Sequence, residues 1–363
     1  MKLGLYCHLP FCVSKCSYCD FFTVIGREDA IPDYVDAICR EIELYADRES
    51  LVDTVFLGGG TPSLLEPDQL GGILDAVRNH FRLGDNVEVT CETNPETVNL
   101  ARLKAFRSIG INRLSLGIQS FHLPELVQLT RAHNVQRAVD CIRDAREAGF
   151  DNLSIDLISA LPGMRLESWM DNLERAVSLE PNHISAYTLE YHPGTKVSRE
   201  REAGLIQPAQ EAMEREMYLK TIEYLEANGF HHYEISNFAR PGFECRHNLK
   251  YWRHESYLGF GTSSHSFLGH RRWWNHANLD RYLEDLSNGI KPVGGSEELE
   301  ESQLELERLT LGLRTRQGAE WNEVVLPSGI PGHLIERNGT RIALTSEGFA
   351  LYDSVCDVFA RSV

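Results

Sequence analysis

The sequence is poor in positive charge and has no long apolar run. Its 363 residues include 36 Lys and Arg against 53 Asp and Glu, which gives a net charge of −17. This balance argues against a nucleic-acid partner, because phosphate binding depends on clustered Lys and Arg. No apolar run approaches membrane-spanning length, and the first residue leads into a predicted strand rather than a signal peptide. We therefore expect no transmembrane segment, and at most peripheral contact with a membrane.

A disulfide framework is also missing. The chain has nine cysteines, an odd number, and only three of them lie close together in the sequence. Scattered free thiols are typical of a reducing compartment, so the sequence predicts a cytoplasmic protein. Hydrophobic content of 42% and charged content of 25% are ordinary for a globular protein, and the length allows two or three domains. The scattered cysteines are Cys7, Cys39, Cys91, Cys141, Cys245 and Cys356.

The three clustered cysteines, Cys12, Cys16 and Cys19, have the spacing CxxxCxxC. Three thiolates can ligate three irons of a [4Fe–4S] cluster and leave the fourth iron open. The amino and carboxylate groups of S-adenosylmethionine can fill that position, and one electron then cleaves its sulfonium, in chemistry that belongs to the cofactor. With the aromatic Tyr18 just before the last cysteine, the run resembles the radical-SAM signature.

A structural zinc site is the alternative interpretation. Cys7 lies five residues before the run, so four thiolates stand close enough in sequence for a tetrahedral site. However, Leu3, Leu5, Cys7 and Leu9 alternate along a predicted buried strand, which favours Cys7 as a small core residue. No second CxxC knuckle follows, as zinc ribbons usually require. The spacing therefore favours iron–sulfur over zinc.

Short β-branched runs alternate with helical patterns up to about residue 230. Six βα units imply parallel strands joined by right-handed crossovers, which fit either a doubly wound sheet or a partial (β/α)6 TIM-like barrel. We expect an α/β fold with the partial (β/α)6 barrel, because polar groups gather at the carboxyl ends of the predicted strands. The predicted strands are 3–9, 53–58, 87–91, 113–118, 153–158 and 183–189, and the predicted helices are 32–49, 67–80, 97–109, 134–148 and 166–179.

Polar groups follow the carboxyl ends of all six predicted strands, which is where barrels gather their chemistry. Each has a structural alternative: Glu92 could cap a helix, and Asp156 could be a satisfied core carboxylate. Chance placement at six matching ends is a poor explanation. The segments are the cysteine loop, Gly58–Ser63, Glu92–Pro95, Gln119–Phe121, Asp156 and Tyr187–Glu190.

The glycine run Gly58–Gly60, followed by Thr61, is neither a Walker A loop nor a GxGxxG motif. Read alone, it is a plain strand-to-helix turn. After a cluster loop, we interpret it as backbone kept bare for close approach to a ligand, with N–H and C=O groups pointed at that ligand.

The remainder of the chain predicts two further parts. Residues 231–278 are densely aromatic and polar, 290–300 have the composition of a linker, and 299–314 form a predicted helix. A short strand from Arg341 and a capped helix from Ser346 to about Ala360 complete a small, mainly helical, winged-helix-like domain, most simply a packing lid. The predicted domains are therefore a partial barrel at 1–230, an extension at 231–290 and a C-terminal domain at 299–363.

Nearly the whole chain resembles the coproporphyrinogen-dehydrogenase-like branch of the radical SAM superfamily. The family opening Tyr-x-His-x-Pro-Phe-Cys matches from Tyr6. The dehydrogenases carry a fourth cysteine two places after the third, where Phe21 stands here, and a longer N-terminal extension than the eleven residues before Cys12. His247–Trp252 instead matches the HNxxYW motif of the HemW-type heme chaperones. Later family blocks match at Gly58–Ser63, Asn112–Phe121, Arg131–His133 and Tyr233–Ala239.

This resemblance implies a role for each matched residue and no catalytic residue. Cys12, Cys16 and Cys19 would hold the cluster, and Glu92 would face the amino-acid end of S-adenosylmethionine. The remaining cofactor residues would be Tyr6, Tyr18, Gly59, Gly60 and Thr61 lining its site, and Gln119, Arg131 and Asp156 bonding the ribose hydroxyls and neighbouring groups.

For heme, the resemblance implies axial ligation by His247, packing by Tyr251 and Trp252, and Cys245 as a second possible ligand. The alternative is an aromatic patch that braces the barrel against the C-terminal domain. The implied protein binds a [4Fe–4S] cluster, S-adenosylmethionine and heme, takes electrons from a donor and passes heme to apoproteins, such as those of respiratory chains. The rival is an oxygen-independent coproporphyrinogen III dehydrogenase-like enzyme acting on a porphyrinogen or heme.

Two segments depart from the family pattern. Ser159–Arg165 replaces the usual aromatic-Gly-Leu-Pro-Gly-Gln-Thr, and Gly261–His265 stands where Gly-Pro-Gly-Ala-His is typical. Because both could border the pocket, they put the geometry of heme or substrate in doubt, whereas the cluster and cofactor residues are unchanged.

Overall fold

The computed structural model describes residues 2–321 and 326–361. The chain folds into two compact units that interleave along the sequence. The first comprises 1–156, 190–206 and 256–298, and the second comprises 157–189, 207–255 and 299–363. The chain first passes from one unit to the other within strand β5 (Asn152–Ser159).

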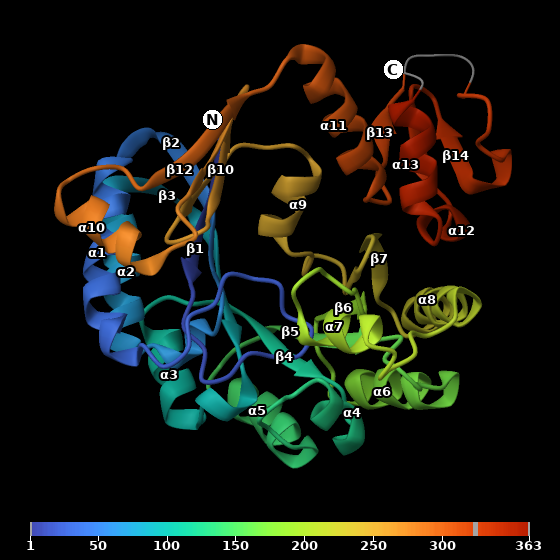
Figure 1. Ribbon diagram of the computed structural model, residues 1–363, viewed down its shortest axis with the longest axis horizontal. Helices are drawn as coiled ribbons and strands as arrows, with labels where there is room; N and C mark the ends of the chain where they lie inside the picture. The colour runs from blue at the N-terminus through green and yellow to red at the C-terminus, as the bar shows by residue number, and fades with distance from the viewer. Residues whose placement is uncertain (1, 322–325, 362–363) are drawn as a thin grey trace. The chain divides into compact units, whose positions relative to one another are not determined.

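The first unit is built on a largely parallel sheet (Figure 1). Strand β1 pairs in parallel with β2 on one side and with β9 on the other, and β2, β3 and β4 continue in parallel. The alternation that predicted the first strand is confirmed, since Leu3, Leu5, Cys7 and Leu9 are all buried. In sheet order the strands are β12 (Val293–Glu298), β11 (Arg271–Asn275), β10 (His265–Leu268), β9 (Tyr257–Phe260), β1 (Lys2–Leu9), β2 (Asp47–Gly59), β3 (Phe81–Thr93), β4 (Arg113–Gln119) and β5.

Residues 290–300 are not a linker, which corrects the expectation from composition. Residues 293–298 form β12, an edge strand antiparallel to β11. Its polar side chains are mostly exposed, and Gly295 lies so close to Trp274 that a Cβ there would stand 2.5 Å from the indole ring. Composition misses this strand because an exposed edge strand needs few apolar residues.

The helices of the first unit begin and end at the signals the sequence carries. Asn99, Asn134 and Asn278 cap helix N-termini through their side chains, and Gly110 and Gly149 follow helix ends with positive φ angles of 104° and 89°. The predicted helix 32–49 ends early, because Asp47 Oδ1 accepts the N–H groups of two following residues. The helices are α1 (Ile31–Leu44), α2 (Pro67–His80), α3 (Leu100–Ser108), α4 (Leu123–Gln128), α5 (Val135–Glu147), α7 (Lys196–Glu202) and α10 (Leu279–Ser287).

A buried carboxylate fixes one of the segments that depart from the family pattern. Glu41 of α1 is fully buried and accepts hydrogen bonds from the Gly261 N–H at 2.8 Å, Tyr282 Oη at 2.7 Å and Asn275 Nδ2 at 2.6 Å. Burial raises the pKa of Glu41 to about 7, although these hydrogen bonds oppose the shift. The turn after β9 is therefore anchored to α1 from beneath.

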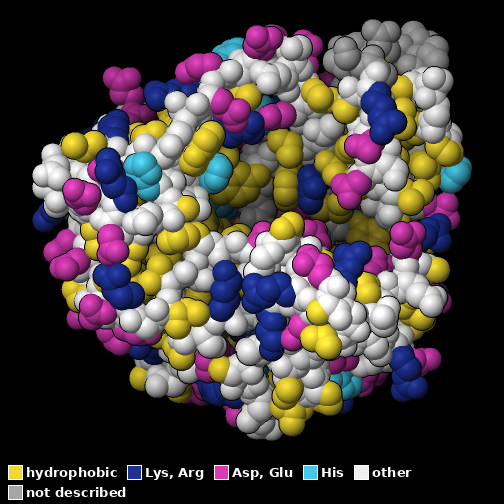
Figure 2. All heavy atoms as spheres, viewed as in Figure 1, with side chains coloured by type: hydrophobic (Ala, Val, Ile, Leu, Met, Phe, Trp, Pro, Cys, Tyr) yellow, Lys and Arg dark blue, Asp and Glu magenta, His cyan; other side chains and the backbone are white. Residues whose placement is uncertain are grey.

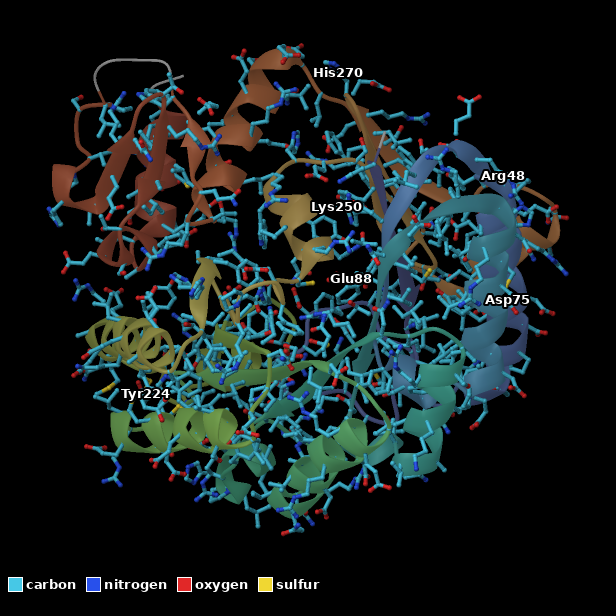
Figure 3. All side chains as sticks on the ribbon, turned by 180° about the vertical axis from the view of Figure 1, so that it is seen from behind. Arg48, Asp75, Glu88, Tyr224, Lys250 and His270 are labelled. Carbon is cyan, nitrogen blue, oxygen red and sulfur yellow. The ribbon has the colours of Figure 1, made fainter. Side chains whose placement is uncertain are left out.

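In the second unit, the last three strands of the 12-stranded sheet pair antiparallel in the order β6-β8-β7, with helices beside them. Trp169 Nε1 donates to Thr221 Oγ1 at 2.8 Å and joins α6 to α8. Figure 3 shows Lys250 on α9. Its side chain is almost fully buried and pairs with Glu255 at 3.0 Å. The elements are β6 (His183–Thr188), α6 (Leu166–Ser178), α8 (Glu211–Ala227), β7 (His231–Glu234), β8 (Asn237–Ala239) and α9 (Arg246–Trp252).

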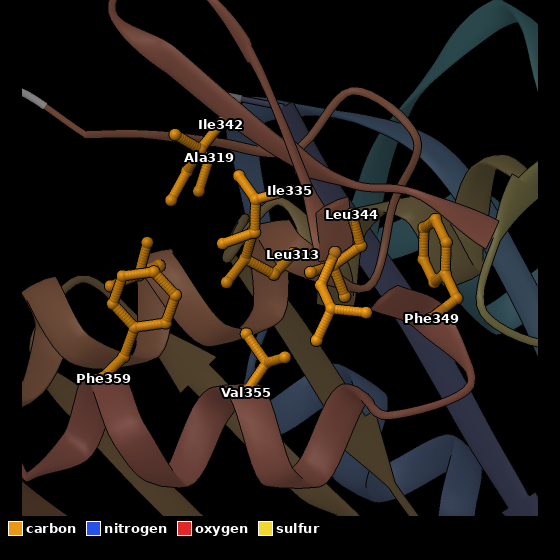
Figure 4. Packing of buried hydrophobic residues seen from close by; sticks show 10 residues of the cluster. Leu313, Ala319, Ile335, Ile342, Leu344, Phe349, Val355 and Phe359 are labelled. Atoms are coloured by element: carbon orange, nitrogen blue, oxygen red, sulfur yellow. The ribbon is translucent and has the colours of Figure 1, made fainter. Parts of the chain in front are cut away.

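The end of the second unit has helices and a small sheet around an apolar cluster (Figure 4). The predicted helix from Ser346 to Ala360 is interrupted at Leu351, which has non-helical backbone angles, and Gly348 in its first part packs directly on the carbonyl of Leu334. A Cβ at Gly348 would stand 2.1 Å from that oxygen. The elements are α11 (Glu301–Leu313), β13 (Ala319–Glu320), β14 (Ile335–Asn338), β15 (Arg341–Leu344), α12 (Ser346–Phe349) and α13 (Tyr352–Ala360).

Taken unit by unit, the architecture confirms the predicted class. It is α/β, its main sheet is mostly parallel and stays open, since β12 at its edge pairs with β11 alone, and its C-terminal part combines helices with a small sheet. On the face in Figure 2, Lys and Arg side chains stand among Asp and Glu side chains. Within the described ranges, no helix is long and apolar enough to cross a membrane.

Candidate functional site

The cysteine loop follows β1 directly. It is closed at its base by two backbone hydrogen bonds: Cys12 N donates to Val24 O at 3.0 Å, and Val24 N donates to Pro10 O at 2.8 Å. Cys12 is buried, Cys16 and Cys19 are half-buried, and all three thiols are free of disulfides. The loop therefore presents three thiols from a closed base, as a cluster loop requires.

Hydrogen-bond donors and cations surround these thiols. Thr61 Oγ1 lies 3.3 Å from Cys12 Sγ, and Arg131 Nη1 donates to Cys16 Sγ at 3.3 Å. Burial raises the pKa of Cys12, and it raises the pKa of Cys19 to about 11, while Lys15 opposes both shifts. Without metal, these two thiols thus hold their protons, which iron displaces on binding.

The donor set fits an iron–sulfur cluster by its chemistry. Soft thiolates are the ligands of such clusters, and nearby cations and hydrogen-bond donors offset the negative charge that builds up on the sulfur atoms. In the part of the chain that the structure describes, no three His, Cys, Asp or Glu side chains converge as ligands for a metal ion. The three cysteines of the loop are therefore suitable ligands by their chemistry, although their side chains do not converge on one point.

The glycine run after β2 is held by the protein itself. Gly59 N donates to Glu92 Oε2 at 3.0 Å, Gly60 N donates to Leu9 O at 2.9 Å, and Thr61 N donates to Phe11 O at 2.9 Å. The interpretation that these three N–H groups point at a ligand is therefore wrong.

The glycines allow β2 to approach the end of β1 closely, at His8 and Pro10. A Cβ on Gly60 would stand 2.6 Å from the backbone of Pro10, and one on Gly59 would stand 2.5 Å from the His8 ring. Gly59 also has a φ of +111°, which L side chains rarely adopt. These glycines let the ends of β1 and β2 lie against each other.

Arg131 is the centre of a buried polar network. Its Nη2 donates to Asn94 Oδ1 at 2.6 Å and to Gly117 O at 2.9 Å, which leaves Nη1 directed at Cys16. A side chain on Gly117 would collide with this network, because a Cβ there would stand 2.9 Å from Asn94 Oδ1 and 3.1 Å from Gln119 Nε2.

Two further residues stand beside this network. His133 Nδ1 lies 3.3 Å from Glu96 Oε2, and the other ring nitrogen lies 3.1 Å from Ile118 O. Burial opposes ionisation of Glu96, but the His133 contact and the charge of Arg131 outweigh it and lower the Glu96 pKa. Glu96 thus carries negative charge close to the Arg131 guanidinium.

Two half-buried carboxyl groups, Glu92 and Asp156, have different hydrogen-bond partners. Burial raises the pKa of Glu92 to about 7, and the nearby Asp156 adds to the shift, while the bond from Gly59 N opposes it. Asp156 accepts from Ser115 Oγ at 2.9 Å and from Ser154 Oγ at 3.0 Å. The charge of Asp156, within β5, thus helps to keep the pKa of Glu92, at the end of β3, above its ordinary value.

The predicted cluster and adenosylmethionine residues all lie in the first unit, on or after strands β1 to β5. A continuous chain of contacts runs from Cys12 through Thr61, Asn94 and Arg131 to Cys16. The Tyr6 hydroxyl lies 3.0 Å from His8 Nδ1. Its ring and the Glu92 carboxylate both border Gly58, since a Cβ there would stand 3.0 Å from Tyr6 Cε2 and 3.1 Å from Glu92 Oε2. Sequence reasoning did not assign Asn94 a role, although its position after a predicted strand was a usable signal.

The heme motif lies in the second unit and is differently arranged. His247 is buried, and its Nε2 lies 2.9 Å from Tyr251 Oη, with the two rings perpendicular. Cys245 is also buried, and its N–H donates to Tyr233 Oη at 3.2 Å. The Arg314 guanidinium lies over the indole of Trp252, with its Cζ 4.5 Å from the ring centroid of Trp252. An iron bound to Nε2 of His247 would have to displace the Tyr251 hydroxyl.

Comparison with known proteins defines the class first. Residues 6–176 match the model of the radical SAM superfamily. The crystal structure of coproporphyrinogen III oxidase HemN from Escherichia coli, a radical SAM enzyme, superposes with a TM-score of 0.85 over 99% of this chain and 90% of that one. At 23% identity, this likeness shows a shared fold.

Curated relatives then define the family. The chain is 36% identical to the heme chaperone HemW of Mycobacterium tuberculosis, over 97% of this chain and 93% of the relative. It is 34% identical to the heme chaperone HemW of Bacillus subtilis, over 86% of this chain and 83% of the relative. The chain therefore belongs to the HemW family of the radical SAM superfamily.

Proposed function

We propose that this protein is a cytoplasmic heme chaperone. In this proposal, Cys12, Cys16 and Cys19 hold a [4Fe–4S] cluster, S-adenosylmethionine binds beside it, and heme binds in the second unit before transfer to an apoprotein. The main support is the three-cysteine loop, which has Phe21 where the dehydrogenases carry a fourth cysteine. In addition, the chain is related along most of its length to proteins named heme chaperone.

The cofactor site is proposed residue by residue. The bound cluster would supply one electron at a time and an open iron for S-adenosylmethionine. Thr61 and Arg131 hold the sulfur atoms of Cys12 and Cys16 in place through contacts of 3.3 Å each.

The other first-unit residues would contact S-adenosylmethionine itself. Glu92, with a pKa raised to about 7 by burial, would bind the amino group of S-adenosylmethionine in its charged form. Its remaining contacts are proposed for Tyr6, Tyr18, Gly59, Gly60, Gln119 and Asp156.

The proposed partners follow from this role. They are heme, an electron donor for the cluster, and heme-accepting apoproteins such as those of a respiratory chain. Metal content tests the cluster against the zinc alternative. Anaerobically reconstituted protein should show broad absorbance at about 400 nm and about four irons per chain.

A heme titration followed in the Soret region tests the proposal. Wild type is compared with His247→Ala and with His231→Ala, a control at an exposed histidine of the same unit. Saturable binding that is weakened in His247→Ala alone supports the heme site. Saturable binding that is equally strong in His247→Ala would mean that the protein binds heme but that His247 is not a ligand. No saturable binding, together with porphyrin formation from coproporphyrinogen, would make the chain an enzyme instead.

A further inference from the structure

A pocket of about 780 Å³ opens within the second unit, between α9 and the C-terminal sheet and helices. Its volume lies within the range of pockets that hold cofactors, roughly 300–1,000 Å³. Its walls come from the end of α9, one face of α11, and the strands β13 and β15. We propose that this pocket holds heme by its macrocycle and its carboxylates, an inference that rests on the proposed chaperone function.

The apolar walls suit a flat aromatic ligand. The apolar part of the lining consists mainly of Trp252, Trp321, and Leu306 and Leu309 of α11. Each indole is held by a neighbour outside the lining: Trp252 by the Arg314 guanidinium at 4.5 Å from the ring centroid, and Trp321 by the Phe359 ring at 5.1 Å in an edge-on arrangement. Aromatic rings fixed in this way offer stacking surfaces without losing much conformational entropy.

The charge of the pocket suits carboxylates. Three arginines and two glutamates line it, so its formal charge is +1 in a chain whose net charge is −17. Arg341 is already paired with Glu320 at 2.7 Å and also donates to two backbone carbonyls. Two arginines therefore remain to meet the ligand.

Those two arginines are loosely engaged. Arg253 is exposed and donates a long hydrogen bond of 3.4 Å to Gln317 Oε1. Arg308 is exposed and pairs with Glu301 on the same helix at 2.8 Å, an exposed ion pair that a ligand carboxylate can replace. Because Arg253 caps the end of α9 and Arg308 lies on α11, the two guanidiniums reach the pocket from different elements, and each can receive one carboxylate.

The lining offers no axial ligand for iron. It contains no His, Cys, Met or Tyr among the described residues, and His247 lies on the same helix as Trp252 but does not line the pocket. The pocket therefore recognises the porphyrin and leaves the iron to a ligand from elsewhere. A carrier that releases its cargo needs such a site, since strong ligation from the pocket itself would slow release.

The test uses the reconstituted full chain and two probes, heme and iron-free protoporphyrin IX. Binding is followed by Soret absorbance for heme and by porphyrin fluorescence for protoporphyrin IX. The variant is Arg253→Glu with Arg308→Glu. The control, Arg337→Glu with Arg361→Glu, makes the same change of charge on the same unit outside the pocket. A third variant, Arg253→Lys with Arg308→Lys, keeps the charge, and circular dichroism confirms that each variant folds.

We expect wild type to bind protoporphyrin IX saturably, and less tightly than heme by the contribution of the iron ligand. The Glu variant should weaken both probes at least tenfold, while the control stays within twofold and the Lys variant recovers most of the affinity. Heme binding with no binding of protoporphyrin IX, or a Glu variant equal to the control, would overturn the pocket and leave the chaperone function standing. If wild type binds neither probe, both the pocket and the proposed function fall.

Discussion

The cysteine loop of the first unit and helix α9 of the second present their candidate metal ligands in opposite ways. The loop is irregular, its thiols are free, and donors such as Thr61 and Arg131 already point at sulfur. In α9, His247 is buried in a regular helix with its Nε2 engaged by Tyr251. The first arrangement suits a resident cofactor, while the second has to exchange an internal bond for an iron bond, as a reversible carrier would.

The largest effect expected from this comparison is loss of the cluster. Cys16→Ala removes one of only three thiolate ligands, so iron content after anaerobic reconstitution should fall from about four per chain to near zero. Cys39→Ala, at a half-buried cysteine of α1, should keep full iron content. Equal iron content in the two variants would show that the loop does not hold the metal.

The next effect concerns the stability of the first unit. Glu41→Ala leaves the Tyr282 hydroxyl and the Gly261 N–H without their acceptor, which should lower the free energy of unfolding by about 3 kcal/mol. Asn275 Nδ2 keeps Gly261 O and Ser264 Oγ as acceptors. Glu43→Ala, on the exposed side of the same helix, should cost little. Thermal unfolding measures both, and similar losses would contradict the account of this network.

The same carboxyl group sets a pH dependence. Its pKa rises from 4.5 to about 7 on folding, so the folded state binds its proton more tightly. Its contribution to stability is fully present below pH 4.5 and is lost as the pH rises through 7. Glu92 and Glu234, whose pKa values burial also raises to about 7, act in the same direction. Glu41→Gln should therefore flatten only part of the decline in melting temperature over this range.

A smaller effect should appear at α9. Tyr251→Phe removes the hydroxyl that engages His247 Nε2, a hydrogen bond worth about 1 kcal/mol. If His247 ligates heme iron through this nitrogen, heme affinity should rise about fivefold in a Soret titration. A variant with unchanged heme affinity and spectrum would instead assign His247 to the packing of the second unit.

The smallest effect is a shift in the cluster potential. Asn94 Nδ2 donates to Thr61 Oγ1 at 3.2 Å, which directs the Thr61 proton toward Cys12 Sγ. Thr61→Val should keep the iron but lower the reduction potential by tens of millivolts, because hydrogen bonds to sulfur raise it. Thr23→Val serves as the control on the same loop. Identical potentials in the two variants would remove Thr61 from this role.

The sequence predicted those parts of the molecule in which neighbouring residues determine the structure. Cluster spacing, the buried alternation of β1 and the asparagine caps act over a few residues, so they can be read locally. The linker assigned to 290–300 was wrong because β12 owes its existence to β11, a partner strand that composition does not reveal.

The candidate site shows the same division. Glu92 and Arg131 could be found from their places after strands, but the destinations of their hydrogen bonds could not. The Gly59 and Gly60 N–H groups were expected to face a ligand, and only the packing of β2 against β1 shows that protein atoms receive them. Likewise, the pocket beside Trp252 joins residues about 90 positions apart, from Trp252 to Arg341.

The rate of heme transfer from the heme-loaded, reconstituted protein to a respiratory apocytochrome shows whether the protein acts as a chaperone. The rate is compared with heme loss to an excess of apomyoglobin, which collects only released heme. The account predicts faster transfer to the apocytochrome than to apomyoglobin at equal concentrations. Equal rates would mean that heme leaves by passive dissociation, which would contradict the assignment as a chaperone.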